Sequence, residues 1–283
     1  MRGDFPTLLK VRKVLIPAAG FATRSLPATK AIPKEMLPLV DKPILQYAVE
    51  EAVASGITQV GFITAAWKTA IERHFGRNPE LEEFLRGKRK TGILEEMKKI
   101  ENFAEYSYIL QPEQHGLGHA ILMGEEFAGG EPVAVMNPDT VYDCPVPCLR
   151  QLIDVYAEKG ATTVVLGKID REGTKKYGVV RAERLCDRVF RILDLAEKPG
   201  PEKAPSDMAV LGRYVFTPAI FDAIRKTSPG YGGEIQITDA IRILLEKEPV
   251  YGVLFEGRRF DAGDKRGYLD AILHFSLKRG GNG

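Results

Sequence analysis

The chain of 283 residues is poor in the side chains that build disulfide scaffolds and zinc sites. It has four histidines and only three cysteines, which are Cys144, Cys148 and Cys186. An odd number of cysteines leaves one unpaired, and the sequence contains no CxxC pair and no Cys/His spacing typical of zinc ligands. These absences argue against a disulfide framework and a zinc centre, and we expect a reducing, cytoplasmic environment.

The sequence also lacks a long apolar run and a strong charge of either sign. No apolar stretch approaches the roughly 20 residues that cross a bilayer, and the first residues, MRGDFPTLLKVRK, contain no apolar signal core. The 40 basic residues nearly balance 38 acidic ones, for a net charge of +2. General attraction to nucleic acid or to a membrane is therefore not expected, and we predict a soluble protein whose anion sites are local.

Three well-known catalytic and nucleotide-binding motifs are absent as well. There is no GxxxxGK[ST] P-loop, no GxGxxG between a strand and a helix, and no GxSxG nucleophile elbow. P-loop nucleotide binding, Rossmann-type dinucleotide binding and acyl transfer by a hydrolase elbow therefore have no support in this sequence.

The sequence does contain a long basic loop after its first strand-like segment. The apolar run at 14–16 is followed by a long connection, before the helix predicted from Pro43, that carries Arg24, Lys30 and Lys34. Connections between a strand and a helix usually take about two to six residues, and long loops in compact domains are often functional. Five prolines between positions 17 and 43 each fix a backbone dihedral. We therefore predict a stiff, ordered loop that binds an anion.

Strand-like and helix-like segments alternate along the first half of the chain. A helix beginning at Pro43 and ending at Gly56, followed by a strand at 59–64, makes a βαβ unit with the first strand and implies a parallel sheet. The same alternation continues with two or three short helices within 67–103, strands at 106–110, 132–136 and 162–168, and helices at 119–127 and 147–159.

The second half has a different texture, with short alternating segments that indicate antiparallel strands. These segments are 177–182, 188–198 and 208–216, and they are followed by helices at 218–226, 237–247 and 265–278 and strands at 250–254 and 258–261. The length and the 44% hydrophobic content suffice for one large α/β domain, which we favour over two small ones.

Two aspartates follow strand-like segments at positions suited to a metal. Asp139 comes just after 132–136, where open α/β sheets have their ligand crevice, although a lone aspartate there more often forms a cap or an Asx turn. Asp261 ends the segment 258–261. Together with the basic loop, these carboxylates suit a nucleoside triphosphate and Mg²⁺. The two glycines within 111–118 either let a ligand approach the backbone or only make a turn.

Several longer motifs occur in a fixed order from Val14 to about Tyr268. They are PATKAIPKEMLP, LGHA, YGVV, EKP, GRYVF, GEIQITDAI and FDAGDKRGY. Together they resemble the bacterial UTP-glucose-1-phosphate uridylyltransferase family, also called UDP-glucose pyrophosphorylases, which are sugar nucleotidyltransferases. The resemblance implies a single Rossmann-like α/β domain over 1–283, with a mixed, mainly parallel central sheet flanked by helices.

The resemblance further implies a division of this domain and a reaction. The nucleotide-binding half would span about 11–140 and the sugar-binding half about 141–270, with a disordered tail at 279–283. The enzyme would transfer a uridylyl group from UTP to α-D-glucose 1-phosphate in a reversible, Mg²⁺-dependent reaction of carbohydrate metabolism, as a homodimer or homotetramer. Two alternatives remain open: another nucleotide or hexose 1-phosphate, such as dTTP, or a catalytically weak regulatory protein that binds nucleotide sugars.

The resemblance also assigns roles to individual residues. Ala18, Ala19 and Gly20 would contact the base and the ribose. The uracil edge would be bound by Gln111 and Gly116, and the glucose hydroxyls by Gly178 and Glu197. Arg24 and Lys34 would hold the phosphates that leave as pyrophosphate, and Lys198 the sugar phosphate. Asp139 and Asp261 would bind Mg²⁺.

One position departs from the family pattern. Where the family usually has G-x-G-T-R, this chain has alanine at the second glycine, Ala22. If this position needs a positive φ, the Cβ costs about 1 kcal/mol or more. If it needs only close approach of the backbone to a phosphate, a methyl group still fits.

Overall fold

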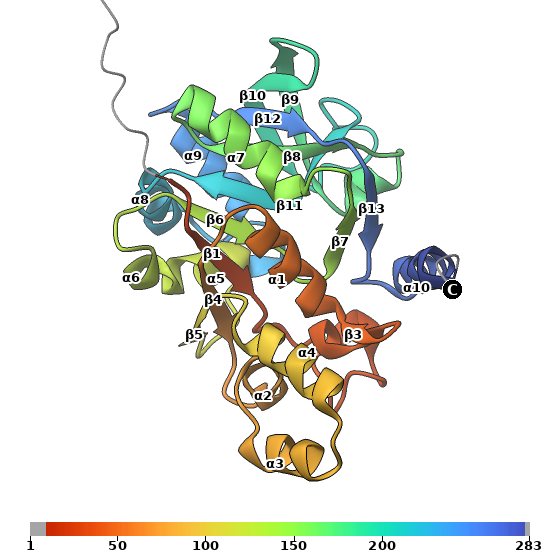
Figure 1. Cartoon of the computed structure of the whole chain (residues 1–283). Coiled ribbons are helices and arrows are strands. Elements are labelled where there is room, and N and C mark those ends of the chain that lie inside the picture. The colour runs from red at the N-terminus through yellow and green to blue at the C-terminus, as the bar shows by residue number, and fades with distance from the viewer. Residues whose placement is uncertain (1–9, 281–283) are drawn as a thin grey trace, which may run out of the picture.

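The computed structural model describes residues 10–280 and is built around a nine-stranded sheet (Figure 1). Its strand order is β5-β4-β1-β6-β11-β8-β12-β10-β9. Seven of these nine strands run in one direction, and β11 and β10 run against them. The predicted α/β fold with a mixed, mainly parallel sheet is therefore confirmed.

The bounds of the nine strands follow the sequence prediction closely, and β4 matches it at both ends. In chain order the strands are β1 (Lys13–Pro17), β4 (Gln59–Thr64), β5 (Glu105–Leu110), β6 (Val133–Met136), β8 (Thr163–Lys168), β9 (Gly178–Arg184), β10 (Val189–Glu197), β11 (Met208–Phe216) and β12 (Tyr251–Leu254).

Ten α-helices occur among the described residues, and no helix there is long and apolar enough to cross a membrane. They are α1 (Ile44–Ala54), α2 (Thr69–Phe75), α3 (Pro79–Gly87), α4 (Thr91–Glu101), α5 (Leu117–Met123), α6 (Glu125–Ala128), α7 (Cys148–Lys159), α8 (Ala219–Lys226), α9 (Ile237–Leu245) and α10 (Lys265–Gly280). Helix α10 reaches two residues into the predicted tail at 279–283, and 281–283 lie outside the described residues.

Helices cover both faces of the sheet, and each face has its own apolar core. Figure 1 shows α1 and α7 on the near side, where they share a core cluster with Val14 and Ile16 of β1. Leu15 points to the other face and joins the cluster that includes α5, α8 and α9. A parallel strand buried on both faces reads as a continuous apolar run, which is why Val14–Ile16 was recognisable in the sequence.

Two small sheets lie beside the main one and shape the site. The hairpin of β2 (Pro38–Leu39) and β3 (Lys42–Pro43) lies at the end of the basic loop, and β7 (Thr140–Asp143) pairs antiparallel with β13 (Arg258–Asp261). These pieces and α10 enclose a third apolar cluster. The sequence reasoning predicted β13 and missed β7, β2 and β3. Strands β2 and β3 have only two residues each, which is too short to show a readable alternation.

Local details differ from the prediction at two helix ends. Pro43 is the N-cap of α1 and not its first residue. The helix predicted at 119–127 is divided into α5 and α6 at Gly124, where a Cβ would lie 2.4 Å from Leu15 Cδ1. Glycine therefore lets this break pack directly against β1.

Candidate active site

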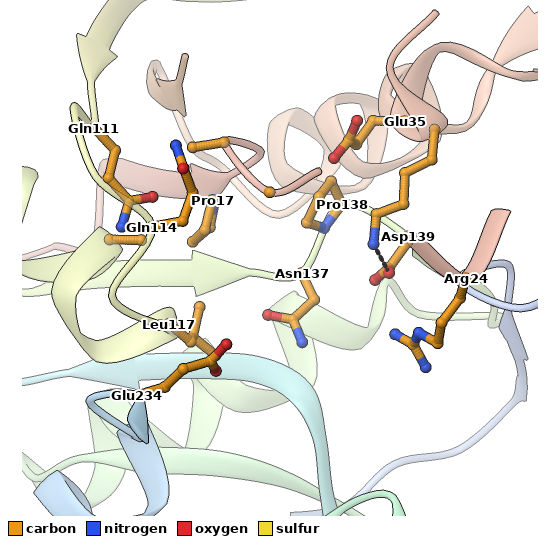
Figure 2. Close-up of a pocket in the computed structure, with 15 residues that line it drawn as sticks. Pro17, Arg24, Glu35, Gln111, Gln114, Leu117, Asn137, Pro138, Asp139 and Glu234 are labelled. Atoms are coloured by element: carbon orange, nitrogen blue, oxygen red, sulfur yellow. Dashed lines mark hydrogen bonds and ion pairs between the residues drawn. The ribbon is translucent and has the colours of Figure 1, made fainter. Parts of the chain in front are cut away.

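A cavity of about 350 Å³ opens at the carboxyl ends of the central strands (Figure 2). Strands β1, β6 and β5 end beside it, because parallel strands bring their carboxyl ends to one edge of a sheet. Its walls are Pro17, Ala19, Gly20, Arg24, Lys34, Glu35, Gln111, Gln114, Gly116, Leu117, Ala120, Asn137, Pro138, Asp139 and Glu234. In Figure 2, Gln111 and Gln114 lie on one side of the space and Arg24 and Asp139 on the other.

The basic loop is ordered by short structured turns. It contains two 3-10 turns, Thr23–Ser25 and Lys34–Met36, before the β2–β3 hairpin. The first turn carries Arg24 and the second Lys34, and both side chains reach the cavity. The predicted stiff loop with a basic lining is thus present.

Lys34 and Asp139 form a close ion pair across the cavity wall, with Nζ 2.6 Å from Oδ2. Burial acts against the charged form of Lys34, but the Asp139 carboxylate outweighs it, so the pKa of Lys34 lies above its ordinary value. Burial likewise favours protonation of Asp139, and Lys34 with nearby Arg24 holds its pKa below the usual range. Both partners are therefore charged at neutral pH. This ion pair connects the segment after β6, which carries Asp139, with the basic loop, which carries Lys34.

Asp261 approaches the same point from β13. A Cβ on Gly263 would lie 2.5 Å from Asp139 Oδ2 and 3.1 Å from Asp261 Oδ1, so glycine keeps open a small space that both carboxylates face. Tyr177 donates its hydroxyl hydrogen to Asp261, and Arg259 Nη2 lies 2.9 Å from the same oxygen. These contacts orient the Asp261 carboxylate toward Asp139.

This carboxylate pair fits a hard divalent cation such as Mg²⁺. Within residues 10–280 no group of three or more His, Cys, Asp or Glu is arranged to hold a metal. Magnesium in phosphate-transfer sites commonly takes one or two carboxylates and completes its shell with phosphate oxygens and water. Asp139 and Asp261 could supply that number of protein ligands.

The predicted sugar-binding residues lie together but outside the cavity walls given above. Gly178 and Glu197 are directly opposite each other in the β9–β10 ladder. Thr238 Oγ1 donates to Glu197 Oε2 over 2.7 Å, and a Cβ on Gly178 would lie 2.7 Å from that hydroxyl oxygen. Lys198 has a left-handed backbone with φ of 44°, and its Nζ lies 3.2 Å from Glu197 Oε1.

Packing requires the glycines of the loop at 111–118, and one of them also lines the cavity. Gly116 is at the cavity wall, and its φ of 99° and its close approach to Glu234 Cβ and the Ile235 backbone require glycine. Gly118 packs against Ile235, where a Cβ would lie 2.8 Å from the carbonyl oxygen. Gln111 is buried beside the cavity, with Nε2 2.9 Å from His119 Nδ1.

Ala18 lies behind the cavity, and its neighbours Ala19 and Gly20 line it. The Ala18 carbonyl accepts a hydrogen bond from Lys68, whose Nζ is also 3.2 Å from Glu35 Oε1. Lys68 and Glu35 are both fully buried, and burial raises the pKa of Glu35 and lowers that of Lys68. The sequence reasoning did not single out this pair, because the neighbouring helices look uniformly charged.

Glu234 is another cavity residue that the sequence reasoning missed. It comes from a polar loop before α9, more than 90 residues after Asp139, and reaches the side of the cavity near Leu117 (Figure 2). Asn137 and Pro138 also line the cavity, and their adjacency to Asp139 was the signal that could have identified them.

The sequence model of the family described as nucleotidyl transferase matches residues 13–276. This chain belongs to that family. It is similar to two UTP-glucose-1-phosphate uridylyltransferases of Bacillus subtilis, one 49% identical over 270 residues, with 95% of this chain and 91% of the relative covered. The other is 46% identical over 269 residues, with coverage of 95% and 92%.

Solved structures of the nucleotidyl transferase family agree with the observed fold. A UDP-glucose pyrophosphorylase complexed with UDP-glucose superposes with a TM-score of 0.88 at 40% identity, covering 95% of this chain and 99% of that one. A UTP-bound UGPase from Acinetobacter baumannii has a TM-score of 0.88 at 36% identity, with coverage of 95% and 94%. The resemblance seen in the sequence motifs is confirmed.

The structure of this nucleotidyl transferase decides between the two possibilities for Ala22, whose φ of 54° and ψ of 40° are left-handed. This backbone conformation lowers the folding stability of an alanine by about 1–2 kcal/mol. Glycine adopts it without strain, but its greater conformational entropy in the unfolded chain lowers folding stability by roughly 0.4–1 kcal/mol. Ala22→Gly is therefore expected to raise the free energy of unfolding slightly and to retain or raise turnover. Urea unfolding and steady-state rates measure both. A clear loss of turnover would mean that the loop has adapted to alanine.

Proposed function

We propose that this nucleotidyl transferase transfers the uridylyl group of UTP to α-D-glucose 1-phosphate and releases pyrophosphate, giving UDP-glucose. The observation that carries the proposal is similarity over 95% of the chain to proteins named for this reaction and to structures bound to UTP and to UDP-glucose. The cavity supports it independently, because one side offers cations and carboxylates and the other offers amides.

The nucleotide is proposed to lie along this cavity with its base near Gln111. Ala19 and Gly20 form a wall without bulky side chains, and Ala18 supports them from behind. Gln111 and Gly116 then lie at the edge of the base, where an amide side chain and a backbone group distinguish bases by hydrogen bonds. The triphosphate extends toward Arg24 and Lys34 on the other side.

Arg24 and Lys34 are proposed to hold the β- and γ-phosphates. Joining two polyanions requires their repulsion to be cancelled, so charge stabilisation and alignment carry the catalysis. An oxygen of the sugar phosphate attacks the α-phosphorus as the bond to the bridging oxygen breaks and pyrophosphate leaves. The phosphate monoester is already a competent nucleophile, so no side chain is needed as general base.

Asp139 and Asp261 are proposed to hold Mg²⁺, which would neutralise charge on the two reacting phosphates. Before substrate binds, Lys34 neutralises Asp139 at 2.6 Å. A metal bound at Asp139 would supply that counter-charge in its place, and Lys34 would then serve the phosphates.

The glucose phosphate is proposed to bind at Gly178, Glu197 and Lys198. The carboxylate of Glu197, fixed by Thr238, suits sugar hydroxyls. The Lys198 backbone N–H donates to the Tyr177 carbonyl, and the Tyr177 hydroxyl donates to Asp261. Tyr177 therefore connects the amino acids proposed to bind the sugar phosphate with one of the proposed metal ligands through hydrogen bonds.

Two halves of the domain are proposed to divide the substrates. Nearly all residues around the cavity come from within 11–140, whereas the residues proposed to bind the sugar phosphate come from within 141–270.

We also propose a homodimer or homotetramer, to be tested by light scattering of the purified protein.

A substrate panel tests the proposed function. Purified protein with Mg²⁺ is given UTP or dTTP and glucose 1-phosphate or another hexose 1-phosphate, and products are scored by mass and by pyrophosphate release. UDP-glucose is expected as the dominant product. A different dominant nucleotide sugar would reassign the substrates, and no release above a boiled control, despite UDP-glucose binding, would favour a regulatory binding protein.

A further inference from the structure

Arg213 of β11 is fully buried, and every one of its N–H groups has an acceptor. Nε and Nη2 donate to the Glu51 carboxylate over 3.1 and 2.8 Å. Nη1 donates to the carbonyls of Asn137 and Gly212, both at 3.0 Å, and Nη2 also donates to that of Thr140 at 2.7 Å. A guanidinium carries five donors in a rigid plane, and here all five are used.

Two of these acceptors flank Asp139 in the chain. Asn137 lies two residues before it and Thr140 one residue after it, so Arg213 holds the backbone on both sides. The Asp139 carbonyl itself accepts the N–H of Ala262, 2.8 Å away. The direction of the Asp139 side chain therefore depends on how this short segment is held.

A bulge in β11 directs Arg213 toward that segment. The register of β11 against β8 shifts between Val210 and Tyr214. Within the bulge, Gly212 has a φ of 80°, and a Cβ there would lie 2.8 Å from Asn137 Nδ2. Bulges re-aim side chains and are common beside active sites.

Glu51 connects this arginine to the helix that follows the basic loop. Glu51 lies on α1, and its Oε1 also accepts the N–H of Leu149 at the start of α7 over 2.9 Å. The carboxylate is nearly buried and pairs directly with the guanidinium. The Glu51–Arg213 ion pair thus joins α1 to the Asp139 segment, in addition to the direct pair between Lys34 and Asp139.

We propose that Arg213, anchored by Glu51, is a positioning residue that keeps Asp139 opposite Lys34 and beside Asp261. Arg213 does not touch the cavity and acts only through the backbone of 137–140. The inference rests on the proposed function, which assigns Asp139 to the metal. An arginine that only stabilised the fold would change the unfolding temperature without changing metal affinity.

Arg213→Lys tests the proposal, because lysine keeps the charge but has only three donors on a flexible stem and cannot reproduce the planar fork. Mn²⁺ serves as the metal probe, and its dissociation constant in the presence of UTP is measured by calorimetry. We expect this constant to rise about 10–100-fold, as for other residues that orient metal ligands, with a similar fall in kcat. Hydrogen exchange at the amides of 137–142 is expected to accelerate.

Leu244→Ala is the matched control, since Leu244 is fully buried in the core cluster on the other face of the sheet. It is expected to lower the unfolding temperature while leaving Mn²⁺ affinity and exchange at 137–142 unchanged. The proposal would be overturned if Arg213→Lys kept wild-type Mn²⁺ affinity and wild-type hydrogen exchange. It would also be overturned if Leu244→Ala, at equal thermal destabilisation, lost as much Mn²⁺ affinity and exchange protection as Arg213→Lys.

Glu51→Gln gives a second test that keeps the arginine, and a smaller change in the same direction is expected. An unchanged Mn²⁺ affinity and unchanged exchange in Glu51→Gln would refute the anchoring role of Glu51. The binding and exchange measurements do not require turnover. The exchange measurement also needs no UTP, so it decides the positioning role even if the substrate panel fails to give UDP-glucose.

Discussion

Replacing Lys34 by alanine is expected to lower kcat for UDP-glucose formation by about 10²-fold or more. A preorganised charge in a site shielded from water is worth far more than in bulk solvent, and losing one such group commonly costs this much. Lys34 retains its positive charge because Asp139 raises its pKa, and it lies where the leaving pyrophosphate is proposed to bind. Steady-state kinetics with varied UTP separate the effect on kcat from that on KM.

Asp139→Ala is expected to lower kcat to a similar extent, because it removes one of the two proposed metal ligands. Circular dichroism should show an intact fold in both variants, since each change lies at the cavity wall. Lys175→Ala is the control: its pair with Glu172 is exposed, and exposed pairs contribute about 0–1 kcal/mol. A near-wild-type kcat in either Lys34→Ala or Asp139→Ala contradicts the assigned roles.

Lys68→Met is expected to destabilise the protein by about 3–5 kcal/mol, the usual cost of breaking a buried ion pair. The side chains of Lys68 and Glu35 are both fully buried. A methionine at position 68 would leave the Glu35 carboxylate and the Ala18 carbonyl without their hydrogen-bond donor. Urea unfolding gives the free energy, and the midpoint of thermal unfolding should fall by on the order of 10 °C.

A double variant separates the lost charge partner from lost packing. Lys68→Met combined with Glu35→Gln removes both charges, and most of the lost stability should return, because an uncompensated buried charge is the main cost. Lys175→Met is the exposed control and should change stability by less than about 1 kcal/mol. If the double variant is as unstable as Lys68→Met alone, the carboxylate is not the source of the destabilisation.

The main elements could be predicted from the sequence because their signals are local. The run at Val14–Ile16 is apolar throughout since β1 is buried on both faces, and β10 mixes buried and exposed residues since one of its faces is partly exposed. The basic loop could be recognised for the same reason, because it is longer and more basic than a simple connection between a strand and a helix.

The sequence suggested that Asp139 and Asp261 serve one Mg²⁺ site, but not how the chain brings them together. Their proximity depends on β7 pairing with β13, which places Asp261 opposite Thr140 across more than 100 residues of chain. Periodicity within one segment carries no information about such a partner, so residue reasoning alone named both aspartates without showing that they meet.

The sequence by itself determined the fold class, the order of most strands and helices, the basic loop and, through its motifs, the family. Only the tertiary structure decided the left-handed backbone of Ala22, the burial of Lys68 with Glu35, and the acceptors of the buried Arg213 guanidinium. The physical reason is the range of the interactions: burial periodicity is set by neighbours along the chain, whereas a buried charge is stabilised by partners that only the packed sheet brings within hydrogen-bond distance.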